Sequence, residues 1–575
     1  MKIAIVHKEK CNPESCGKLC SKLCPVNRKG EDCIIIEKKA SISEELCIGC
    51  AICQNRCPFN AISIINLPEK LDKDLIYRFG KNGFALYRLP LLRFGSILGL
   101  FGKNGIGKST TLKIFSGHLK INFGREKAEE KEIKEYFKGS ELLNYFENID
   151  KIKISYKPQN LSELGNSKVK VSDVISQIQK DKKKIGKIVS ELNIENFLDR
   201  QLNQLSGGEL QKVSIAIAFL KDADVYFIDE PLAYLDIEER IRISNFIRKI
   251  VSEKKAVIVV EHDLLMLDFL TDYINIFYGN PSDYGVVSTV MTSKTAVNTY
   301  LGGFLKEDNI RFRDKPIKFF KIEQKQKSNF KLFDWPNFTK TFKNFKLNVN
   351  SSFINEGSVT GIIGKNGIGK TTFVKCLANE IDIDKGKIDS KKMRFAYKPQ
   401  YLNSNSDDLV AAIIKKEKID KYLIHLFSLE MLNIKKIKEL SGGELQRLEV
   451  ARCLSKDADL YLIDEPSAYL DVEERLNVAK AINEIIANKS KACFVVDHDL
   501  LFLSYVADSL LVFSGEAGKN GETSKSLDFS EGLNRLLKEL NITVRRDEET
   551  LRPRINKPDS VLDRKQKEKG KYFED

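Results

Sequence analysis

Two glycine-rich segments with the same pattern lie in the two halves of the chain. They read Gly-Lys-Asn-Gly-Ile-Gly-Lys-Ser at residues 102–109 and Gly-Lys-Asn-Gly-Ile-Gly-Lys-Thr at residues 364–371. Each follows an apolar run, 96–101 or 359–363, which predicts a buried parallel strand leading through the turn into a helix. Glycines there let backbone N–H groups surround phosphate oxygens, the lysine reaches the β and γ oxygens, and the hydroxyl binds Mg²⁺. We therefore expect two Mg²⁺-nucleotide sites.

Carboxylates and histidines follow later apolar strands in the same order in both halves. In the first half a strand over 226–229 ends on Asp229, which suits the Mg²⁺ shell, and Glu230 is predicted to act as general base for the attacking water. His262 follows a strand over 256–260 and is predicted to contact the γ-phosphate. Gln159, in Tyr-Lys-Pro-Gln, suits a loop that senses Mg²⁺ and γ-phosphate. The counterparts in the second half are Asp464, Glu465, His498 and Gln400.

The segment Leu-Ser-Gly-Gly-Glu occurs at residues 205–209 and 440–444. Its serine and the following N–H groups at a helix N-terminus form an anion site that a domain cannot offer to its own nucleotide. This resembles the ATP-binding cassette (ABC) superfamily, in which each signature completes the partner's site. The resemblance implies two composite sites, and Asp236 and Asp471 match the D-loops that cross between them. The implied pairs are Lys108 with Ser441 and Lys370 with Ser206.

The predicted nucleotide contacts also include an aromatic residue ahead of each phosphate loop, which would stack on adenine. Phe79 and Phe84 hold suitable places in the first half and Trp335 in the second, and Phe79 and Trp335 stand where relatives have Tyr. The predicted Mg²⁺ ligands are Ser109, Thr371, Gln159 and Gln400. The remaining predicted nucleotide contacts are Gly102, Asn104, Gly105, Gly107, Thr110, Gly208, Gly364, Asn366, Gly367, Gly369, Thr372 and Gly443.

Eight cysteines form two runs near the start of the chain. The second run has the Cys-x₂-Cys-x₂-Cys-x₃-Cys-Pro spacing of bacterial ferredoxins, and the first is stretched to four, three and three intervening residues. Thiolates at this spacing hold [4Fe–4S] clusters; zinc is the alternative for four-cysteine sites, and paired Cys-x₂-Cys motifs would favour it. The resemblance to two-cluster ferredoxins implies one ligand set of Cys11, Cys16, Cys20 and Cys57 and another of Cys47, Cys50, Cys53 and Cys24, with Cys33 left over.

The second half repeats the first apart from an insertion. Lys108 and Gln159 are 51 residues apart, whereas Lys370 and Gln400 are 30 apart. The surplus fits about residues 127–150, where apolar pairs at i, i+4 on either side of Gly139 predict a helix-loop-helix, with Ser140 as N-cap of its second helix.

The fold class is therefore α/β: two nucleotide-binding domains head to tail and a small ferredoxin-like α+β domain. We expect an iron–sulfur domain at 1–72, a first cassette at 73–298, a connecting hinge at 299–322, a second cassette at 323–543 and a second hinge with the C-terminal tail at 544–575.

The amino-acid composition limits which cellular compartment and which kinds of partner are compatible with the chain. The 575 residues are 42% apolar and 30% charged, as in globular proteins of three or four domains. No apolar run approaches the ~18 residues of a membrane span, and the first ten residues do not form a secretory signal. We expect a cytoplasmic protein, with a nuclear pool also allowed, in a reducing compartment where clustered cysteines bind metal. The net charge of +14 fits either a nucleic-acid partner or a general lysine bias.

The whole chain is similar to ABC subfamily E, the ribosome-recycling ATPases also called RNase L inhibitor. The similarity rests on Cys-Ile-Gly-Cys, Gly-Ile-Gly-Lys-Ser, Asp-Glu-Pro-Ser-Ala-Tyr-Leu-Asp and Arg-Pro-Arg-Ile-Asn, and it covers essentially all 575 residues. It implies a monomer that binds the 70S- or 80S-type ribosome beside a class-1 release factor or Pelota-type factor and splits it. The protein would then stay on the small subunit, linked to initiation factors. The implied contacts to small-subunit rRNA and protein are 127–150, Arg311, Arg313, Arg552 and Arg554.

Three other functions are compatible with parts of the sequence. A transporter ATPase would need membrane subunits encoded elsewhere. A redox protein gated by ATP would take up electrons reversibly, and no flavin motif or other redox motif accompanies the cysteines. A two-cassette translation factor without clusters would contain no iron or sulfide.

Overall fold

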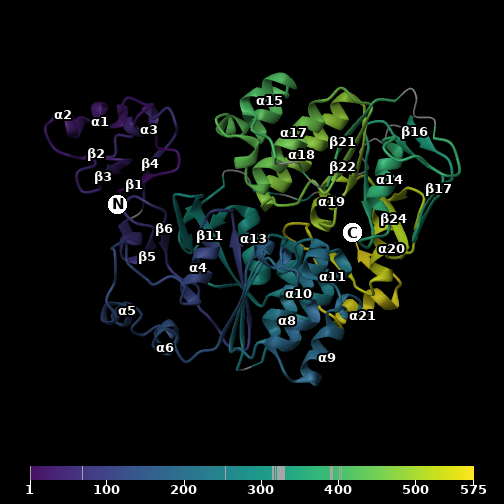
Figure 1. The fold of residues 1–575 in the computed structure, drawn as a ribbon, viewed down its shortest axis with the longest axis horizontal. Helices are drawn as coiled ribbons and strands as arrows, with labels where there is room; N and C mark the ends of the chain where they lie inside the picture. The colour runs from purple at the N-terminus through teal and green to yellow at the C-terminus, as the bar shows by residue number, and fades with distance from the viewer. Residues whose placement is uncertain are drawn as a thin grey trace.

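The computed structural model describes residues 2–574 except 68, 253, 314–315, 318, 320–329, 389–392, 401 and 403–404. It contains a small domain at the N-terminus and two larger α/β domains, cassette 1 and cassette 2, that lie against each other (Figure 1). Among the described residues, none of the helices is both long enough and apolar enough to cross a bilayer.

The N-terminal domain is built on two antiparallel strand pairs. β1 (Lys2–Val6) pairs with β4 (Ile62–Asn66), and β2 (Ile34–Ile36) pairs with β3 (Ala40–Ile42). Their inward side chains pack with Cys11, Cys20, Cys24 and Cys53 in one apolar cluster. The helices between them are short because each spans little more than one turn around a cysteine run: α1 (Leu19–Leu23), α2 (Pro25–Arg28) and α3 (Ile52–Arg56).

Cassette 1 contains a nine-stranded sheet with the order β5-β6-β12-β11-β7-β10-β9-β8, with β13 paired to β11. Its central strands are parallel, and β7, β9 and β10 are buried throughout, which explains their continuous apolar sequences. The strands are β5 (Leu75–Arg78), β6 (Ala85–Tyr87), β7 (Ile97–Gly102), β8 (Ile154–Lys157), β9 (Val225–Asp229), β10 (Ala256–Val260), β11 (Tyr273–Asn280), β12 (Tyr284–Val287) and β13 (Met291–Thr292).

The helices of cassette 1 flank this sheet and form a helical lobe beside it. The main ones are α4 (Lys108–Phe115), α8 (Val171–Ile178), α9 (Lys182–Glu191), α10 (Gly207–Leu220), α11 (Ile237–Ile250), α12 (Leu264–Leu270) and α13 (Ser293–Gly302). The short α7 (Ser162–Gly165), η2 (Glu195–Phe197) and η3 (Leu202–Gln204) complete the lobe, and η1 (Glu69–Asp74) precedes β5.

The predicted insertion is present as α5 (Glu130–Tyr136) and α6 (Glu141–Glu147). Ser140 caps α6, because its side chain accepts a hydrogen bond from Leu142 N at 3.2 Å. Phe137 and Leu142 are buried against the sheet through the cluster that contains Phe115. The hairpin is therefore fixed to cassette 1.

Cassette 2 repeats the architecture, with the strand order β17-β18-β25-β24-β20-β23-β22-β21 and β26 paired to β24. The strands are β17 (Phe338–Phe342), β18 (Phe345–Val349), β20 (Val359–Ile363), β21 (Phe395–Lys398), β22 (Leu460–Asp464), β23 (Ala492–Val496), β24 (Ser509–Glu516), β25 (Asn520–Thr523) and β26 (Leu527–Asp528); β16 (Lys331–Trp335) and β19 (Ser352–Asn355) form a separate pair. The helices are α14 (Lys370–Leu377), α15 (Val410–Lys416), α16 (Lys421–Leu426), α17 (Gly442–Ser455), α18 (Val472–Lys489), α19 (Leu500–Val506) and α20 (Phe529–Glu539), with η4 (Leu429–Leu432) and η5 (Ile437–Glu439).

Two segments join the cassettes. β14 (Phe304–Leu305) and β15 (Ile310–Arg311) follow α13, which spans the predicted boundary after residue 298. The predicted boundary at 322/323 lies outside the described residues, and that at 72/73 falls within η1. At the C-terminus, β27 (Val544–Arg546), β28 (Pro553–Ile555) and β29 (Phe573–Glu574) form a small sheet with α21 (Val561–Glu568).

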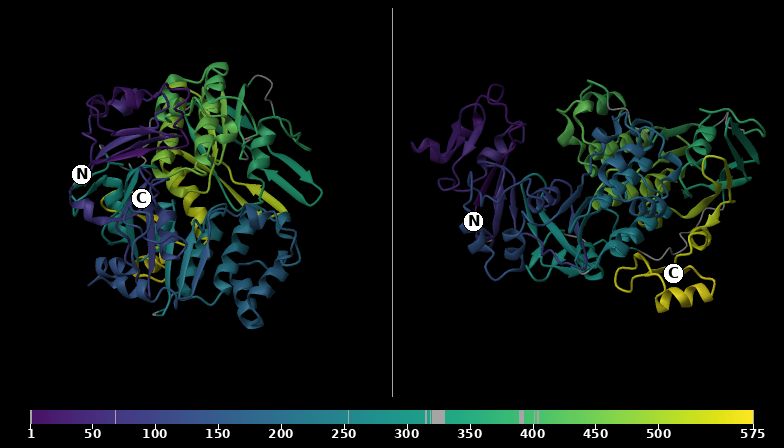
Figure 2. Two further views of the ribbon diagram at one scale, coloured as in Figure 1. Left: turned by 60° about the vertical axis from the view of Figure 1, so that its left-hand side comes forward. Right: turned by 60° about the horizontal axis from the view of Figure 1, so that its bottom comes forward.

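The N-terminal domain sits at the outer edge of cassette 1 and lies apart from cassette 2 in Figure 1 and in the right-hand view of Figure 2. Buried Asn82 of cassette 1 holds it, since its amide donates to Ala4 O at 2.9 Å and to Ile42 O at 3.0 Å. Arg78 forms an ion pair with Glu44, and His7 Nε2 lies 3.0 Å from Asp283 Oδ1. Ile3 and Ile5 of β1 are buried in the same apolar cluster as Tyr87 and Val286 of cassette 1, so apolar packing supports these polar contacts.

Candidate functional site

In each phosphate loop the lysine side chain folds back and bonds the backbone of its own loop. Lys108 Nζ donates to the carbonyl oxygens of Gly102 and Lys103, both at 2.7 Å, and Lys370 makes the matching bonds in cassette 2. Burial lowers the pKa of both lysines to about 8. A buried ammonium held only by carbonyl oxygens is suited to a phosphate anion.

Glycine is required at the last loop position before each helix. Gly107 and Gly369 have φ values of 100° and 99°. A Cβ on Gly107 would lie 2.9 Å from the ring of Phe84, and one on Gly369 would lie 2.9 Å from the ring of Phe345. The loops can therefore approach an aromatic ring and expose their N–H groups only without side chains there.

The predicted Mg²⁺ ligands are adjacent in both cassettes. Ser109 Oγ donates to Asp229 Oδ2 at 3.2 Å, and Thr371 Oγ1 donates to Asp464 Oδ2 at 2.8 Å. A hydroxyl and a buried carboxylate oxygen are donors that Mg²⁺ accepts. Each pair therefore fits one Mg²⁺, which would neutralise phosphate charge there.

The predicted general base of cassette 1, Glu230, lies beside the predicted glutamine and histidine. Glu230 Oε1 accepts a hydrogen bond from Gln159 Nε2 at 2.8 Å and lies 3.5 Å from His262 Nε2. Burial, followed by the charges of Glu261 and Asp229, raises the pKa of Glu230 to about 7. Burial keeps the pKa of His262 well below its usual value, so the ring is neutral. The carboxylate is thus held ready to accept a proton from water near neutral pH.

Cassette 2 repeats this arrangement. Glu465 Oε1 accepts from Gln400 Nε2 at 2.7 Å and lies 3.8 Å from His498 Nε2. Burial and then the charge of Asp464 raise the pKa of Glu465. In both cassettes the glutamate has a positive φ, 46° for Glu230 and 48° for Glu465, which is the kind of backbone strain that occurs at functional sites.

Sequence reasoning missed a lysine beneath each of these glutamates. Lys157 Nζ donates to the carbonyl oxygens of Asp229 and Glu230, at 2.7 Å and 3.1 Å, and Lys398 does the same for Asp464 and Glu465. A signal was available, because a lysine stands two residues ahead of the predicted glutamine in both halves, in Tyr-Lys-Pro-Gln.

The two cassettes join their sites in one continuous cavity of about 2550 Å³. Ser206 and Ser441 cap α10 and α17, each accepting from a backbone N–H at 3.3 Å. The cavity is lined by both phosphate loops and both signatures: Gly105–Ser109, Gly367, Gly369–Thr371, Ser206–Glu209 and Ser441–Glu444. Each signature therefore faces the space that the opposite loop borders.

Reciprocal contacts fix this pairing. Asn366 N donates to Asp236 Oδ2 of cassette 1 at 2.7 Å. Lys365 pairs with Glu238 at 2.7 Å, and Lys103 pairs with Glu473 at 2.8 Å. The D-loop residues of each cassette thus touch the phosphate loop of the other.

The prediction of Trp335 as an adenine-stacking residue is wrong. Its side chain is 2% exposed and packs against Phe373 and Phe494 in the core, and its indole N–H donates to Asn350 O at 3.0 Å. Phe345 instead lines the cavity, as Phe84 and Phe79 do in cassette 1. Phe345 lies beside Gly369 as Phe84 lies beside Gly107, so comparing the two repeats with Phe84 as the reference could have found it.

The cysteines group in space as the ferredoxin spacing implied. Burial raises the pKa of Cys20 to about 11, and Cys16, Cys11 and Cys57 are its thiol neighbours. Burial raises the pKa of Cys53 to about 12, with Cys47 and Cys50 next to it. A small cavity is lined by Cys24, Cys33, Cys47, Cys50 and Cys53.

These thiols fit iron–sulfur clusters. Backbone N–H groups of Ala40 and Ala61 donate to the sulfurs of Cys11 and Cys57, at 3.5 Å and 3.4 Å, and such bonds stabilise cluster thiolates. Since burial disfavours the free thiolates, these cysteines would need the positive charge that cluster iron would supply when bound. Cys33, expected not to be a ligand, lies beside the second group, where burial raises the pKa of its thiol to about 12.

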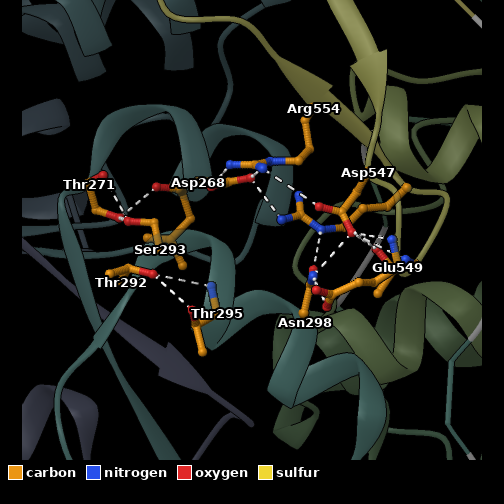
Figure 3. A network of polar contacts seen from close by, with 12 residues as sticks. Asp268, Thr271, Thr292, Ser293, Thr295, Asn298, Asp547, Glu549 and Arg554 are labelled. Carbon is orange, nitrogen blue, oxygen red and sulfur yellow. Dashed lines mark hydrogen bonds and ion pairs between the residues drawn. The ribbon is translucent and has the colours of Figure 1, made fainter.

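The arginines of the two joining segments bind within the protein. Arg552 is fully buried and its Nη2 lies 2.8 Å from Asp268 Oδ2 on α12, while Arg554 Nε lies 2.7 Å from the same oxygen. Figure 3 shows Arg554 and Asp547 of the C-terminal segment meeting Asp268 and Asn298 of cassette 1. Arg313 pairs with Glu473 of cassette 2 at 2.6 Å.

The prediction that Arg552 contacts rRNA is therefore wrong, because no solvent reaches it. Arg554 and Arg313 are occupied by carboxylates inside the fold, and Arg311 remains exposed. These arginines hold the joining segments against the cassettes.

Comparisons with known proteins agree with this arrangement. The family model described as "ABC transporter" matches residues 91–233 and 347–468. A model described as "Possible Fer4-like domain in RNase L inhibitor, RLI" matches residues 1–32, and one described as "4Fe-4S binding domain" matches residues 40–63. The molecule is an ABC-type ATPase with two composite sites for ATP and Mg²⁺ and a domain for two [4Fe–4S] clusters, which excludes the zinc alternative.

Relatives match over their whole length. An uncharacterized ABC transporter ATP-binding protein of Methanocaldococcus jannaschii is 46% identical over 100% of this chain and 97% of its own. Translation initiation factor RLI1 of Saccharomyces cerevisiae is 40% identical, covering 100% and 98%. A structure titled "Model of ribosome-bound archaeal Pelota and ABCE1" matches with a TM-score of 0.94 at 44% identity, covering 100% of this chain and 99% of that one. The chain belongs to the ABCE1/RLI family, also called RNase L inhibitor.

Proposed function

We propose that this protein is an ATP-driven ribosome recycling factor. ATP binding closes the two composite sites, and the closure separates the ribosomal subunits after termination or rescue. The protein then stays on the small subunit and links recycling to initiation. The observation that carries this proposal is the cavity in which Lys108 and Ser441, and Lys370 and Ser206, line one interface, within a chain that matches a ribosome-bound relative throughout.

The residues at the two ATP sites account for how ATP binding and hydrolysis drive closing and reopening of the cassettes. Glu230 and Glu465 accept a proton from the attacking water, and His262 and His498 position that water beside the γ-phosphate. Each signature serine supplies a hydrogen-bond donor from the other cassette. Because the donors of one site come from both cassettes, a bound nucleotide favours the closed arrangement. Hydrolysis removes that preference and allows reopening.

The joining segments connect closure of the two cassettes to movement of other parts of the molecule. Arg313 ties the segment after α13 to Glu473 of cassette 2, and Asp268 ties the C-terminal segment to cassette 1. The iron–sulfur domain is joined to cassette 1 through polar groups and through Ile3 and Ile5, which pack in the apolar cluster of cassette 1. We propose that closure shifts this domain as a rigid head that pushes the subunits apart.

The surface suggests two kinds of ribosomal contact. The insertion at 127–150 contains four lysines and seven acidic residues, so it suits a protein surface better than phosphates. Basic residues for rRNA are exposed on and beside α21, together with Arg311: Arg564, Lys565, Lys569 and Lys571. Arginine and lysine on a structured RNA bind phosphate and read shape.

The partners follow from relatives. One relative's structure is titled with Pelota and the ribosome, and another, with a TM-score of 0.83 at 42% identity over 88% of this chain and 100% of that one, is titled as a complex of archaeal ribosomal stalk protein aP1 and aABCE1. We propose a Pelota-type or class-1 release factor, the stalk and initiation factors as partners, in the cytoplasm. One chain contains both halves of each site, so a monomer suffices.

Sedimentation with purified small subunits tests the proposal. The Glu230→Gln, Glu465→Gln double variant with ATP should co-migrate with the small subunit, because it closes and cannot hydrolyse. Without nucleotide it should stay at the top of the gradient. Absence of co-migration in both conditions would reject a ribosomal function, and iron and sulfide analysis would confirm that the protein used was intact.

A further inference from the structure

A buried carboxylate in each cassette ties the loop after the catalytic glutamate to the histidine loop. In cassette 2 this loop runs from Glu465 through Ser467 to Asp471, and the carboxylate is Asp497, which precedes His498. Cassette 1 has the same layout with two substitutions: Leu232 replaces the serine, and Glu261 replaces the aspartate.

The tie in cassette 2 is strong. Asp497 Oδ1 accepts from Ser467 Oγ at 2.8 Å and from Asp499 N at 2.9 Å. Its Oδ2 accepts from Ser467 N at 3.1 Å. Asp497 and Ser467 are 3% and 6% exposed, so water does not compete for these bonds, and bonds to a charged group are stronger than neutral ones.

The tie in cassette 1 is weaker. Leu232 carries no hydroxyl, and its only bond to the carboxylate is from its backbone N–H to Glu261 Oε2 at 3.3 Å. The other oxygen of Glu261 accepts from His262 N and Asp263 N, at 2.9 Å and 3.4 Å. The carboxylate therefore holds its own loop more than the loop after Glu230.

The two loops end in D-loops that reach the opposite site, and these also differ. Asp236 is anchored there by the 2.7 Å bond from Asn366 N. Over the described residues, the structure has no matching bond from Asn104 N to Asp471, although the charge of Asp471 acts on Lys108. Asp471 is instead held from its own cassette, where its side chain accepts from Glu474 N at the start of α18 at 3.0 Å and its backbone continues the loop that Ser467 holds.

We propose that Ser467 and Asp497 are positioning residues that couple the two ATP sites mainly in one direction, from the histidine loop at the Lys370 site to Asp471 at the Lys108 site. Leu232 and Glu261 provide much weaker coupling in the reverse direction. Together with the different D-loop contacts, this difference makes the pair of sites unequal.

Site-resolved ATPase kinetics of the cluster-loaded full chain test this. Glu465→Gln silences hydrolysis at the Lys370 site and leaves the Lys108 site to be measured. Adding Ser467→Ala should lower kcat there about fivefold with KM changed less than twofold, as expected for loss of one hydroxyl–carboxylate bond. Ser467→Thr, which keeps the hydroxyl, should restore kcat.

The matched control is the reciprocal experiment. In a Glu230→Gln background, Leu232→Ala removes packing and no side-chain hydrogen bond, so the Lys370 site should stay within twofold. Thermal unfolding identifies folded variants, and if Ser467→Ala does not fold, Asp497→Asn takes its place with the same expectation. An unchanged kcat at the Lys108 site, or an equal loss caused by Leu232→Ala, would overturn the proposal.

Discussion

In cassette 1, α12 carries Asp268, which binds Arg552 and Arg554 of the C-terminal segment; in cassette 2, the matching helix α19 carries Ser504, whose hydroxyl donates within its own helix. The same contrast holds elsewhere. Cassette 1 also carries the insertion and the iron–sulfur domain. The groups around Glu230 and Glu465, by comparison, agree to within a few tenths of an ångström.

The difference separates two tasks. Residues that contact ATP must satisfy the same chemistry twice, so they repeat. Residues that attach the C-terminal segment, the insertion and the iron–sulfur domain lie mostly on cassette 1. A nearly symmetric closure of the two ATP sites would therefore move parts that are attached to one side only. The predictions below test this contrast by changing one cassette at a time.

The largest expected effect is at the glutamates. Glu230→Gln and Glu465→Gln should each reduce turnover at their own site about a thousandfold, since a positioned general base contributes ~10²–10⁴. Single-turnover hydrolysis measured for each variant tests this. A single variant that abolishes hydrolysis at both sites would show that the sites do not act as separate chemical centres.

The attachment to cassette 1 should be the next most sensitive feature. Asp268→Ser gives cassette 1 the residue found in cassette 2 and leaves the buried Arg552 without its ion-pair partner, so unfolding should be easier by about 3–5 kcal/mol. Urea denaturation followed by fluorescence measures this. Ser504→Ala is the matched control, expected within about 0.5 kcal/mol; equal losses from both would contradict the asymmetry.

The stability of the nucleotide-free protein should depend on pH through Glu230. Its pKa is about 7, above its ordinary value of 4.5, so its contribution is fully present below pH 4.5 and is lost as pH rises through 7. Glu230→Gln should remove this dependence, making the variant about 2 kcal/mol more stable than the wild type at pH 8 relative to pH 5. Denaturation of both proteins at the two pH values checks the sign, and parallel curves would contradict it.

The smallest expected effect concerns adenine stacking in cassette 2. Phe345→Ala should weaken ATP binding at the Lys370 site about five- to tenfold, because stacking of a base on an aromatic ring contributes ~1–3 kcal/mol. Trp335→Phe should leave binding unchanged, since this side chain packs in the core. Equilibrium binding of a fluorescent ATP analogue in a variant with the Lys108 site disabled distinguishes the two.

Motif order predicted much of the fold and most of the site. The strands predicted at 359–363 and 256–260 match β20 and β10 residue for residue. Short continuous apolar runs are typical of strands buried on both faces of a parallel sheet. The insertion was also predicted, since the offset between repeats located it and the i, i+4 pairs shaped it.

Contacts across the chain could not be predicted in this way. Arg552 is followed by Pro and Arg in a polar tail and looks solvated, yet a carboxylate on α12, 284 residues earlier, makes its burial possible. Trp335 looked like a stacking residue because it precedes a phosphate loop, but β16 pairs with β19 outside the main sheet and turns the indole into the core. Pairing over such distances is set by the whole fold.

Ribosome splitting followed by light scattering tests the central claim most directly. Intact ribosomes with a rescue factor, ATP and the wild-type chain should lose scattering as subunits separate, with no change when nucleotide is omitted. A variant with both signatures blocked, Ser206→Arg with Ser441→Arg, should bind ATP at Lys108 and Lys370 but fail to close, and scattering should persist. Splitting by this blocked variant at the wild-type rate would contradict an ATP-closed composite interface as the motor.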